Sequence, residues 1–540
     1  MSTNRIPVQH IISSEIISKI ESLPQDSLTI SEVCAFLNEL GIDVTVDKDI
    51  TKGYDRDSSN IEGHSDMVCR PKNELETAMT LAVFHQTRHP LTVAAGKTNL
   101  TGSATPEGGG VLSTEKLISP FPVLNSDAQT ICTPVGIYLE EMRKEVLLQS
   151  QNRLHYPVDP TSRNEAMVGG TISCNASGFV PGPQGATRYW TESLELITPQ
   201  GCKITAERNE FISENGEFIL EFPKGEKTLS IPTYPRPEIK NASGVFSNES
   251  GVLDFVDLIV GSEGIFGIVT SVTFKVKPMP KEFLELFFPL PGEKQAVDFH
   301  HYLSQYWDGD LSQLSALEYF GYNCQNYMDN RSYFFADDNE VGIYLQIPLY
   351  NEELEEAAEK YLVMLEKSKC GIQEDRILSL NNPENWKRFF TSRHSIPANA
   401  LDKTRQMDTW SILTDTIVPP EKFGEFLKSA HSILSTGNME YLLFGHLGDC
   451  HLHFHMIPSK SRQKEALMLY DKIVEESARL GGVYSAEHGT GKRKRPDFLR
   501  CYGEDAAEQI RRCKETFDPN NILNKGNVVY PSESFELANG

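Results

Sequence analysis

The segment GHLGDCHLHFH, at residues 445–455, contains four of the fourteen histidines of this 540-residue chain. The apolar run YLLF at residues 441–444 predicts a strand before it, and Gly448-Asp449 predicts a turn within it. A second polar group, Glu487-His488-Gly489, follows at the end of another extended stretch. Neutral imidazoles and a carboxylate are ligands for a borderline divalent metal such as zinc. The two segments therefore predict a metal site with a titratable base beside it.

The histidines after the turn alternate with apolar residues. His451, His453 and His455 are separated by Leu452 and Phe454. Because side chains alternate across a strand, the three imidazoles should share one face while the apolar pair packs on the core. The alternative is a polar strand face that only meets water, which a single histidine would favour. Four histidines answered by a Glu-His pair favour the metal site.

Size and composition are those of a globular protein. A chain of 540 residues exceeds one ordinary core, so we expect two domains. A hydrophobic content of 39% and a charged content of 23% argue against disorder. The net charge of −24 argues against binding to nucleic acid, because a polyanion would be repelled. A small anionic substrate needs only a local positive site.

Targeting signals and cysteine usage favour a cytoplasmic location. The N-terminal residues MSTNRIP lack the basic and apolar regions of a secretory signal. No run approaches the roughly 18 to 20 apolar residues that a membrane-spanning helix requires. The ten cysteines include no C-x-x-C pair, so we expect reduced thiols. Peripheral contact with a membrane is compatible with this composition.

The first part of the chain changes character near residue 60. Residues 1–60 predict a helical N-terminal extension with serine caps at Ser13 and Ser31. From residue 66 short strands alternate with helices, and a strand at 90–95 leads into the small-residue loop GKTNLTGS at 96–103. Such loops let backbone N–H groups converge on an anion, although plain turns are the alternative. The loop matches neither a Walker loop nor the G-x-G-x-x-G pattern.

Two later segments repeat this theme. Residues 156–178 combine YPVDPTS with MVGGTISCNASG, and residues 257–269 read DLIVGSEGIFGIV. Tiny residues leave no side chains to block a flat ligand. Three such loops at strand ends indicate one large extended ligand. Pro278-Met279-Pro280 then predicts a domain boundary, followed by apolar strands and charged helices that indicate an α+β layer.

Two basic features lie in the second half of the chain. Arg393 is a candidate for substrate binding, because a guanidinium grips a carboxylate through two parallel hydrogen bonds. The alternative is an arginine in a surface ion pair, and Arg388 is the next candidate. The run KRKR at residues 492–495 predicts a solvated charged surface, which could also draw an anion toward the site.

In chain order these segments resemble the vanillyl-alcohol-oxidase/PCMH flavoprotein superfamily, in particular the branch of FAD-linked D-lactate, glycolate and D-2-hydroxyglutarate dehydrogenases. The resemblance implies an α+β fold, with a PCMH-type FAD-binding domain at residues 61–280. It also implies an FAD-linked oxidase C-terminal (cap) domain at residues 281–540, which carries the substrate site. The matching motifs are LTG at 100–102, DPTS at 159–162, GG and NASG at 169–178, GSEG at 261–264, GHLGD at 445–449, EHGTG at 487–491 and FDPNNILNKG at 517–526.

The resemblance further implies a non-covalent FAD, since the first loop offers no histidine for a covalent link. The cofactor-binding residues that it implies are Gly96, Lys97, Thr98, Asn99, Leu100, Thr101, Gly102, Asp159, Ser162, Gly169, Gly170, Asn175, Gly178, Glu263, Gly264, Ile268 and Asn524.

By the same resemblance, His446, His453 and Glu487 are ligands of a divalent metal, with zinc as the first candidate. His488 is implied as the base, and Arg393 as the residue that binds the substrate carboxylate. A D-2-hydroxy acid such as D-lactate would then lose its hydroxyl proton to His488 and a hydride to the flavin. A quinone, a cytochrome or an electron-transfer flavoprotein would accept the electrons in place of NAD, and the chain could form a homodimer.

The chain departs from the family pattern at several positions. Cys450-His451 replaces a usual Gly-Asn, His455 replaces an Asn, and Ala95 and Lys97 replace common glycines. The additional imidazoles and the thiol are candidates for further metal ligands. Together the changes allow a substrate that differs from those of the family. The alternatives are D-2-hydroxyglutarate or glycolate oxidation, an oxidase that uses oxygen, a non-redox flavin-dependent ether-lipid synthase, and a binding module without turnover.

Overall fold

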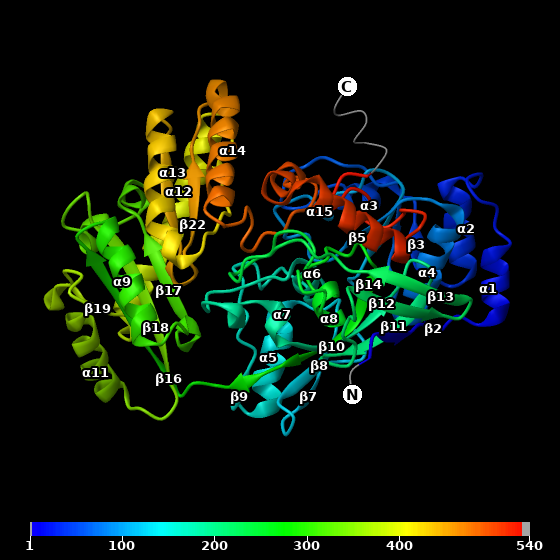
Figure 1. Cartoon of the computed structure of the whole chain (residues 1–540), viewed down its shortest axis with the longest axis horizontal. Coiled ribbons are helices and arrows are strands. Elements are labelled where there is room, and N and C mark those ends of the chain that lie inside the picture. Colours follow the sequence, from blue (N-terminus) through cyan, green and yellow to red (C-terminus); the bar gives the residue numbers. More distant parts are fainter. Residues whose placement is uncertain (1–2, 532–540) are drawn as a thin grey trace.

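The computed structural model describes residues 3–531, which form two lobes side by side (Figure 1). The N-terminal lobe comprises residues 3–280 and also residues 483–531, which return to it from the second lobe. The cap lobe comprises residues 281–482. The predicted boundary at Pro278-Met279-Pro280 lies where the chain first passes between the lobes. Within residues 3–531, no helix is long and apolar enough to cross a membrane.

A small sheet at one side of the N-terminal lobe carries the first predicted loop. Its order is β3-β4-β6-β5, and β4, β6 and β5 run parallel. The crossover helix α4 (Glu74–Thr87) begins after Asn73, whose side chain accepts a hydrogen bond from the Glu76 N–H at 2.9 Å and caps the helix. The strands are β3 (Val44–Thr45), β4 (Met67–Cys69), β5 (Leu91–Ala94) and β6 (Gly110–Ser113).

Two further sheets complete this lobe. The larger has six strands in the order β2-β11-β10-β14-β8-β7, and the smaller has the order β1-β12-β13. The six-stranded sheet consists of β2 (Gln9–His10), β7 (Val123–Asn125), β8 (Thr130–Pro134), β10 (Thr191–Ile197), β11 (Cys202–Glu207) and β14 (Ile268–Lys275). The three-stranded sheet consists of β1 (Arg5–Pro7), β12 (Glu217–Phe222) and β13 (Gly225–Ser230), and the pair β9 (Leu154–His155) and β15 (Lys277–Pro278) leads toward the cap.

The N-terminal segment differs from the helical extension that the sequence predicted. Its helices α1 (Ser14–Glu21) and α2 (Ile30–Glu39) are present, but β1 and β2 join the two sheets, so the segment is part of the lobe. Ser13 caps α1 as predicted. The cap of α2 is Thr29 rather than Ser31, because Thr29 and Glu32 form a reciprocal capping box.

The cap lobe is built on one seven-stranded sheet, β19-β16-β18-β17-β21-β22-β20. Its strands are β16 (Glu282–Leu290), β17 (Ala316–Phe320), β18 (Val341–Leu349), β19 (Leu378–Ser379), β20 (Ile412–Leu413), β21 (Tyr441–His446) and β22 (His451–Met456). Its longer helices are α9 (Glu293–Tyr306), α11 (Leu354–Lys367), α12 (Pro383–Gln406), α13 (Phe423–Thr436) and α14 (Gln463–Arg479). The predicted hairpin around residues 445–455 therefore lies inside this sheet.

The chain returns to the N-terminal lobe through α15 (Arg495–Phe517). Phe517 is fully buried there and packs against Phe266 with ring centroids 5.2 Å apart. Burial of such a side chain contributes roughly 1.5–3 kcal/mol. The predicted solvated run at residues 492–495 is wrong for its two lysines: Lys492 and Lys494 are only 8% and 5% exposed, whereas Arg493 is exposed. Their polar atoms fasten the returning segment, since the backbone N–H groups of Lys492 and Arg493 donate to Thr101 O.

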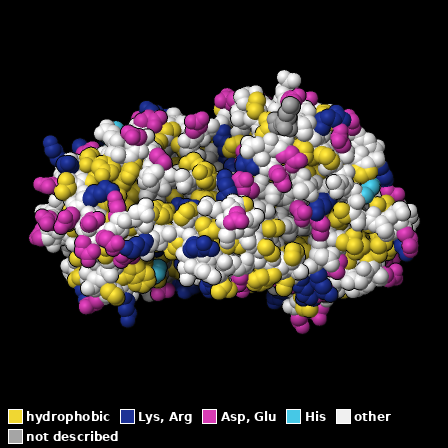
Figure 2. Space-filling model, turned by 90° about the horizontal axis from the view of Figure 1, so that it is seen from below, with side chains coloured by type: hydrophobic (Ala, Val, Ile, Leu, Met, Phe, Trp, Pro, Cys, Tyr) yellow, Lys and Arg dark blue, Asp and Glu magenta, His cyan; other side chains and the backbone are white. Residues whose placement is uncertain are grey.

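The second predicted loop is partly helical. Residues 168–174 form α6 (Val168–Cys174), and its last residues turn through Asn175 in the left-handed region with a φ of 49°. The remaining short helices are α3 (Lys48–Thr51), α5 (Leu139–Ser150), α7 (Thr187–Trp190), α8 (Phe255–Ile259) and α10 (Arg331–Phe334). On the face shown in Figure 2, acidic and basic side chains are interspersed over both lobes.

Candidate active site

A cavity of about 680 Å³ lies in the N-terminal lobe and extends to the cap. All three predicted small-residue loops line it, and His446, Glu487 and His488 line the same cavity. A volume of this size suits a large organic ligand. The predicted cofactor-binding residues that line it are Gly96, Lys97, Thr98, Asn99, Leu100, Asp159, Ser162, Gly169, Gly170, Gly178, Glu263, Gly264, Ile268 and Asn524.

Three predicted cofactor residues, Thr101, Gly102 and Asn175, do not line this cavity. Thr101 is fully buried, and its carbonyl accepts the N–H groups of the returning segment. Asn175 lines a different cavity and accepts a hydrogen bond from the Arg188 N–H at 2.9 Å. The Gly102 N–H donates to Asn99 Oδ1 at 3.0 Å, so all three residues contact the protein itself and fix the conformation of the loops.

Glycine is required at two points of the cavity wall. A Cβ on Gly96 would lie 2.1 Å from Glu165 O, and a Cβ on Gly178 would lie 2.2 Å from Asp159 Oδ1. No side chain larger than hydrogen fits at these distances, so the backbone itself forms the wall. The cavity therefore offers backbone groups to a ligand.

Lys97 stands where the family commonly has glycine, and its backbone explains how it is tolerated. Its φ is 56°, in the left-handed region that glycine prefers. The side chain turns away toward Gly53 and Tyr54: Nζ donates to Gly53 O at 2.6 Å and lies 4.5 Å from the Tyr54 ring centroid. The substitution therefore leaves the space for a ligand open.

Glu263 and Asn524 join distant segments around the cavity. The Glu263 carboxylate accepts hydrogen bonds from the N–H groups of Thr490 at 2.7 Å and Gly491 at 2.8 Å. Asn524 accepts from the Val93 N–H at 2.8 Å and donates to Gly264 O at 2.9 Å. These contacts fix the Glu487-His488 segment against the ligand cavity.

The turn at residues 446–451 brings its two end histidines together. His446 ends β21 and His451 begins β22, and they are directly paired across the hairpin. Glu318 on β17 is the partner of His446 on the other side, and its Oε1 lies 2.7 Å from His446 Nδ1. Because Nδ1 is held by the carboxylate, Nε2 is the nitrogen that faces the site.

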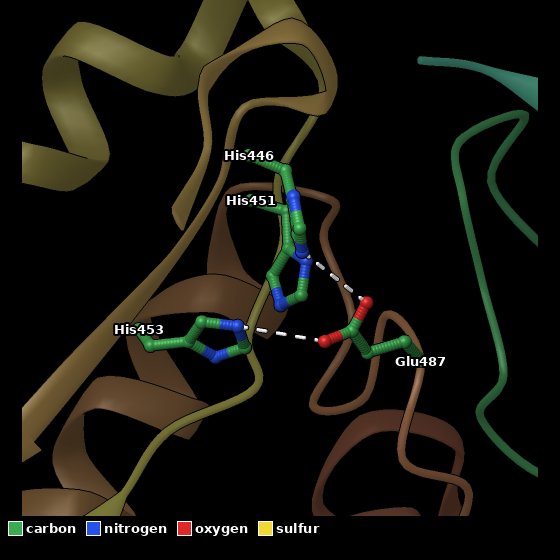
Figure 3. Close-up of side chains that lie close together, drawn as sticks. All are labelled: His446, His451, His453 and Glu487. Atoms are coloured by element: carbon green, nitrogen blue, oxygen red, sulfur yellow. Dashed lines mark ion pairs between the residues drawn. The ribbon is translucent and has the colours of Figure 1, made fainter. Parts of the chain in front are cut away.

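Glu487 lies opposite this hairpin (Figure 3). Its Oε2 is 3.6 Å from His446 Nε2, and its Oε1 is 3.5 Å from His453 Nε2. His453 Nδ1 donates to Thr414 O at 3.0 Å, which again leaves Nε2 toward the carboxylate. Two oriented imidazoles and a carboxylate at these separations suit a divalent metal. The residues present therefore fit the predicted ligand set.

His488 is oriented by a buried carboxylate that the sequence analysis did not select. His488 Nδ1 lies 3.4 Å from Asp415 Oδ2, and its backbone N–H donates to the same carboxylate at 3.0 Å. Asp415 is fully buried and also accepts from Lys494 Nζ at 2.7 Å. With Nδ1 directed at Asp415, Nε2 faces the proposed metal ligand Glu487, whose Oε1 lies 3.5 Å away, and the cavity beside it.

A buried lysine joins the two lobes beside Glu487. Lys240 Nζ from the N-terminal lobe lies 3.2 Å from Asp449 Oδ2 and 3.5 Å from Glu487 Oε2. Its side chain is 1% exposed. Asp449 also accepts from the Gly182 N–H at 2.7 Å. The GHLGD turn is therefore tied to the N-terminal lobe by both oxygens of Asp449.

Arg393 lies on α12, near the site but outside the cavity lining. Its guanidinium is 3.4 Å from Glu318 Oε2 and stacks over the Phe179 ring, with its Cζ 5.2 Å from the ring centroid. Phe179 lines the cavity and also contacts the His446 ring. Arg388, the next candidate, pairs with Glu384 on the surface of the same helix.

Burial and charge set different protonation states for neighbouring histidines. Burial alone would lower the pKa of His446, but the Glu318 and Glu487 carboxylates outweigh it and raise that pKa to about 10. Burial and the adjacent His453 lower the pKa of His451 to about 3. Burial also lowers the pKa of His488, against the opposing effect of Asp415. His488 is therefore neutral at pH 7 and able to accept a proton.

Sequence reasoning missed Glu318, Asp415 and Lys240. Glu318 carried one signal, since it is a single charge inside the apolar strand ALEYF at 316–320 and a buried charge needs a partner. Asp415 and Lys240 lie in irregular segments whose composition resembles ordinary loops. Only the fold places them beside the site.

Comparisons with known proteins identify both domains. The family described as "FAD binding domain" matches residues 65–206, and "FAD linked oxidases, C-terminal domain" matches residues 311–528. D-lactate dehydrogenase of Anaerostipes hadrus is 24% identical over 507 residues, which cover 90% of this chain and 94% of that protein. D-2-hydroxyglutarate dehydrogenase of Stutzerimonas stutzeri is 24% identical over 450 residues, covering 81% and 85%.

The fold itself matches solved structures. That of p-cresol methylhydroxylase has a TM-score of 0.66 at 12% identity, and the alignment covers 96% of this chain and 98% of that one. The predicted α+β architecture, with a PCMH-type FAD-binding domain and an FAD-linked oxidase C-terminal domain, is thereby confirmed. The chain is an FAD-dependent oxidoreductase that combines an FAD binding domain with the C-terminal domain of the FAD-linked oxidases.

Proposed function

We propose that the protein oxidises a D-2-hydroxy acid, of which D-lactate is the type, to the 2-oxo acid, with the assistance of a divalent metal. One observation carries this proposal: His446, Glu487 and His488 line the same cavity as the loops that the family uses for FAD. The metal-binding set and the base therefore lie within reach of a substrate held beside the flavin. Two relatives are named D-lactate dehydrogenase and D-2-hydroxyglutarate dehydrogenase, and these names support the substrate class.

His446, His453 and Glu487 would hold the metal. FAD, when bound, supplies a two-electron acceptor, and a divalent cation supplies a Lewis acid that lowers the pKa of a bound hydroxyl. Zinc suits two imidazoles and a carboxylate. Lys240 holds Glu487 in place through a contact at 3.5 Å.

His488 takes the hydroxyl proton at Nε2. Its Nδ1 faces Asp415, and this contact fixes the ring and stabilises the imidazolium that forms. Arg393 binds the substrate carboxylate and thereby orients the α-carbon, while Glu318 and Phe179 hold the guanidinium in place. The electrons leave to a non-NAD acceptor such as a quinone, a cytochrome or an electron-transfer flavoprotein.

The proposal is tested by anaerobic titration of the FAD-loaded protein with D- and L-2-hydroxy acids. We expect one D-acid to bleach the flavin absorbance, and the L-acid of the same length to leave it unchanged. Removal of metal by a chelator should abolish bleaching, and added Zn²⁺ should restore it. A flavin that no 2-hydroxy acid bleaches would refute the substrate class. Full bleaching in the presence of chelator would refute the role of the metal.

A further inference from the structure

The hairpin brings a third imidazole to the proposed metal site. One ligand atom from each of His446, His451, His453 and Glu487 can be chosen so that all four lie within 4.8 Å of one another. The ring centroid of His451 is 5.6 Å from that of His446 and 4.5 Å from that of His453 (Figure 3). His451 therefore belongs to the same cluster as the ligands that the sequence motif implies.

His451 is buried in the way that a metal ligand would be. It is fully buried, and neither of its ring nitrogens forms a hydrogen bond with any of residues 3–531. An unsatisfied buried imidazole nitrogen costs free energy, so such groups usually have an unseen partner.

The oxygen partners of the three imidazoles follow one pattern. His446 Nδ1 lies 2.7 Å from Glu318, and His453 Nδ1 lies 3.0 Å from Thr414 O. His451 Nε2 lies 3.0 Å from Asp415 Oδ1, an ion-pair distance at an angle that is not that of a hydrogen bond. In each ring one nitrogen faces an oxygen and the other remains free, which is the arrangement that orients metal-bound histidines. Asp415 thus serves His451 as Glu318 serves His446.

The adjacent cysteine and the last histidine of the segment are placed differently. Cys450 Sγ faces the core of the cap and lies 3.4 Å from His300 Nε2 on α9. His455 lies on the same strand as His451 and is also buried with both ring nitrogens unsatisfied, but it is outside the cluster, so the geometry of the cluster distinguishes the two. The choice among the additional ligands that the sequence offered therefore falls on His451.

We propose that His451 is a fourth protein ligand, so that the metal is held by three imidazoles and one carboxylate. This inference rests on the proposed function, because it assigns a residue to the metal site assumed there. Ligands of a tetrahedral zinc lie about 3.4 Å apart, and Glu487 is already 3.5–3.6 Å from His446 and His453. An imidazole-rich set selects zinc or another borderline metal over Mg²⁺ and Mn²⁺.

The test measures metal binding to the FAD-loaded protein after removal of metal with a chelator. We expect His451→Gln to weaken Zn²⁺ binding about 10- to 100-fold, measured by competition with a chromophoric chelator. The same variant should change the visible absorption of bound Co²⁺, which reports ligand number. His455→Gln is the matched control, because it removes a buried imidazole from the same strand outside the cluster. It should leave both measurements unchanged.

A second measurement requires no variant. Zinc X-ray absorption of the wild-type protein should show three coordinated imidazoles; two would overturn the proposal. Unchanged Zn²⁺ affinity and Co²⁺ absorption in His451→Gln, with binding lost in His446→Gln, would also overturn it while preserving the proposed function. If the wild-type protein binds none of these metals, the metal site itself fails, and the inference fails with it.

Discussion

Single side chains balance the charge around the candidate site. Three buried or partly buried cations, Lys240, Lys494 and Arg393, face four carboxylates, those of Glu318, Asp415, Asp449 and Glu487. The raised pKa of His446 supplies a fourth positive charge without metal. A divalent metal bound in place of this proton would leave one net positive charge, which an anionic substrate would neutralise. Charge balance therefore favours metal and substrate together.

Lys240→Met should destabilise the metal-free protein. The change leaves Asp449 and Glu487 without their buried cation, and breaking such a pair costs about 3–5 kcal/mol. We expect a lower melting temperature, and a larger increase on addition of Zn²⁺ than in the wild type, measured by thermal unfolding. Lys224→Met is the control, since its partner Glu21 is a surface residue and the pair should contribute little. Equal melting temperatures for the two variants would contradict the role of Lys240.

His488→Gln should separate chemistry from cofactor binding. Loss of the base should slow anaerobic flavin reduction by roughly 10²- to 10⁴-fold, because general bases contribute about that factor. The FAD content should stay at the wild-type value. His301→Gln, on the exposed face of α9, serves as control, and its flavin should be reduced at the wild-type rate. Unimpaired reduction in His488→Gln would assign the base to another residue.

At the scale of secondary-structure elements, the loops that line the cavity present backbone to a ligand, because close packing leaves no space for a side chain at their glycines. Gly96→Ala would place a methyl group 2.1 Å from Glu165 O and displace the loop at residues 96–103. We expect at least about a tenfold loss of FAD affinity, measured by fluorescence titration of the FAD-free protein. Gly53→Ala meets no atom within 4 Å and should bind FAD as the wild type does. Equal affinities would show that the loop does not contact the cofactor.

The sequence predicted the elements of the site better than their partners. Periodicity placed β21, β22 and the turn between them, because alternation and glycine are local signals. The contacts of Asp415 with His488 and of Lys240 with Glu487 join segments far apart in the chain, and no local pattern encodes them. The same limit explains residues 492–495. A run of four cations predicts side chains exposed to solvent, but in the folded protein this segment forms hydrogen bonds with the buried oxygens of Thr101 and Asp415.

At the scale of the whole molecule, the passage between the lobes contains a half-buried histidine that should make the protein sensitive to acid. His155 on β9 pairs with Lys277 on β15, where the chain leaves for the cap. Burial, with the charges of Lys277 and Arg143, lowers the pKa of His155 to about 3. In the unfolded chain His155 has a pKa near 6.5. Between about pH 3 and pH 6.5 the unfolded state therefore binds a proton at His155 more readily than the folded state does. Stability is therefore complete above about pH 6.5 and declines as the pH falls.

His155→Gln should remove part of this decline. At about pH 5 the expected contribution of His155 is about 1–2 kcal/mol, from the difference between the two pKa values. Urea unfolding at about pH 7.5 and about pH 5 measures this contribution. The free energy of unfolding should fall less from the higher to the lower pH in the variant than in the wild type. An identical loss in both proteins would show that other groups cause the sensitivity.

The return of residues 483–531 to the N-terminal lobe has a consequence for biosynthesis. A ribosome produces the strands of that lobe first and the cap next, and domains generally fold as they emerge. Glu487, His488 and Asn524 come only after the cap has been made. A nascent chain that has reached residue 480 thus lacks both the asparagine that secures the cofactor loops and the proposed base. Flavin loading and catalytic competence should therefore arise together, late in translation.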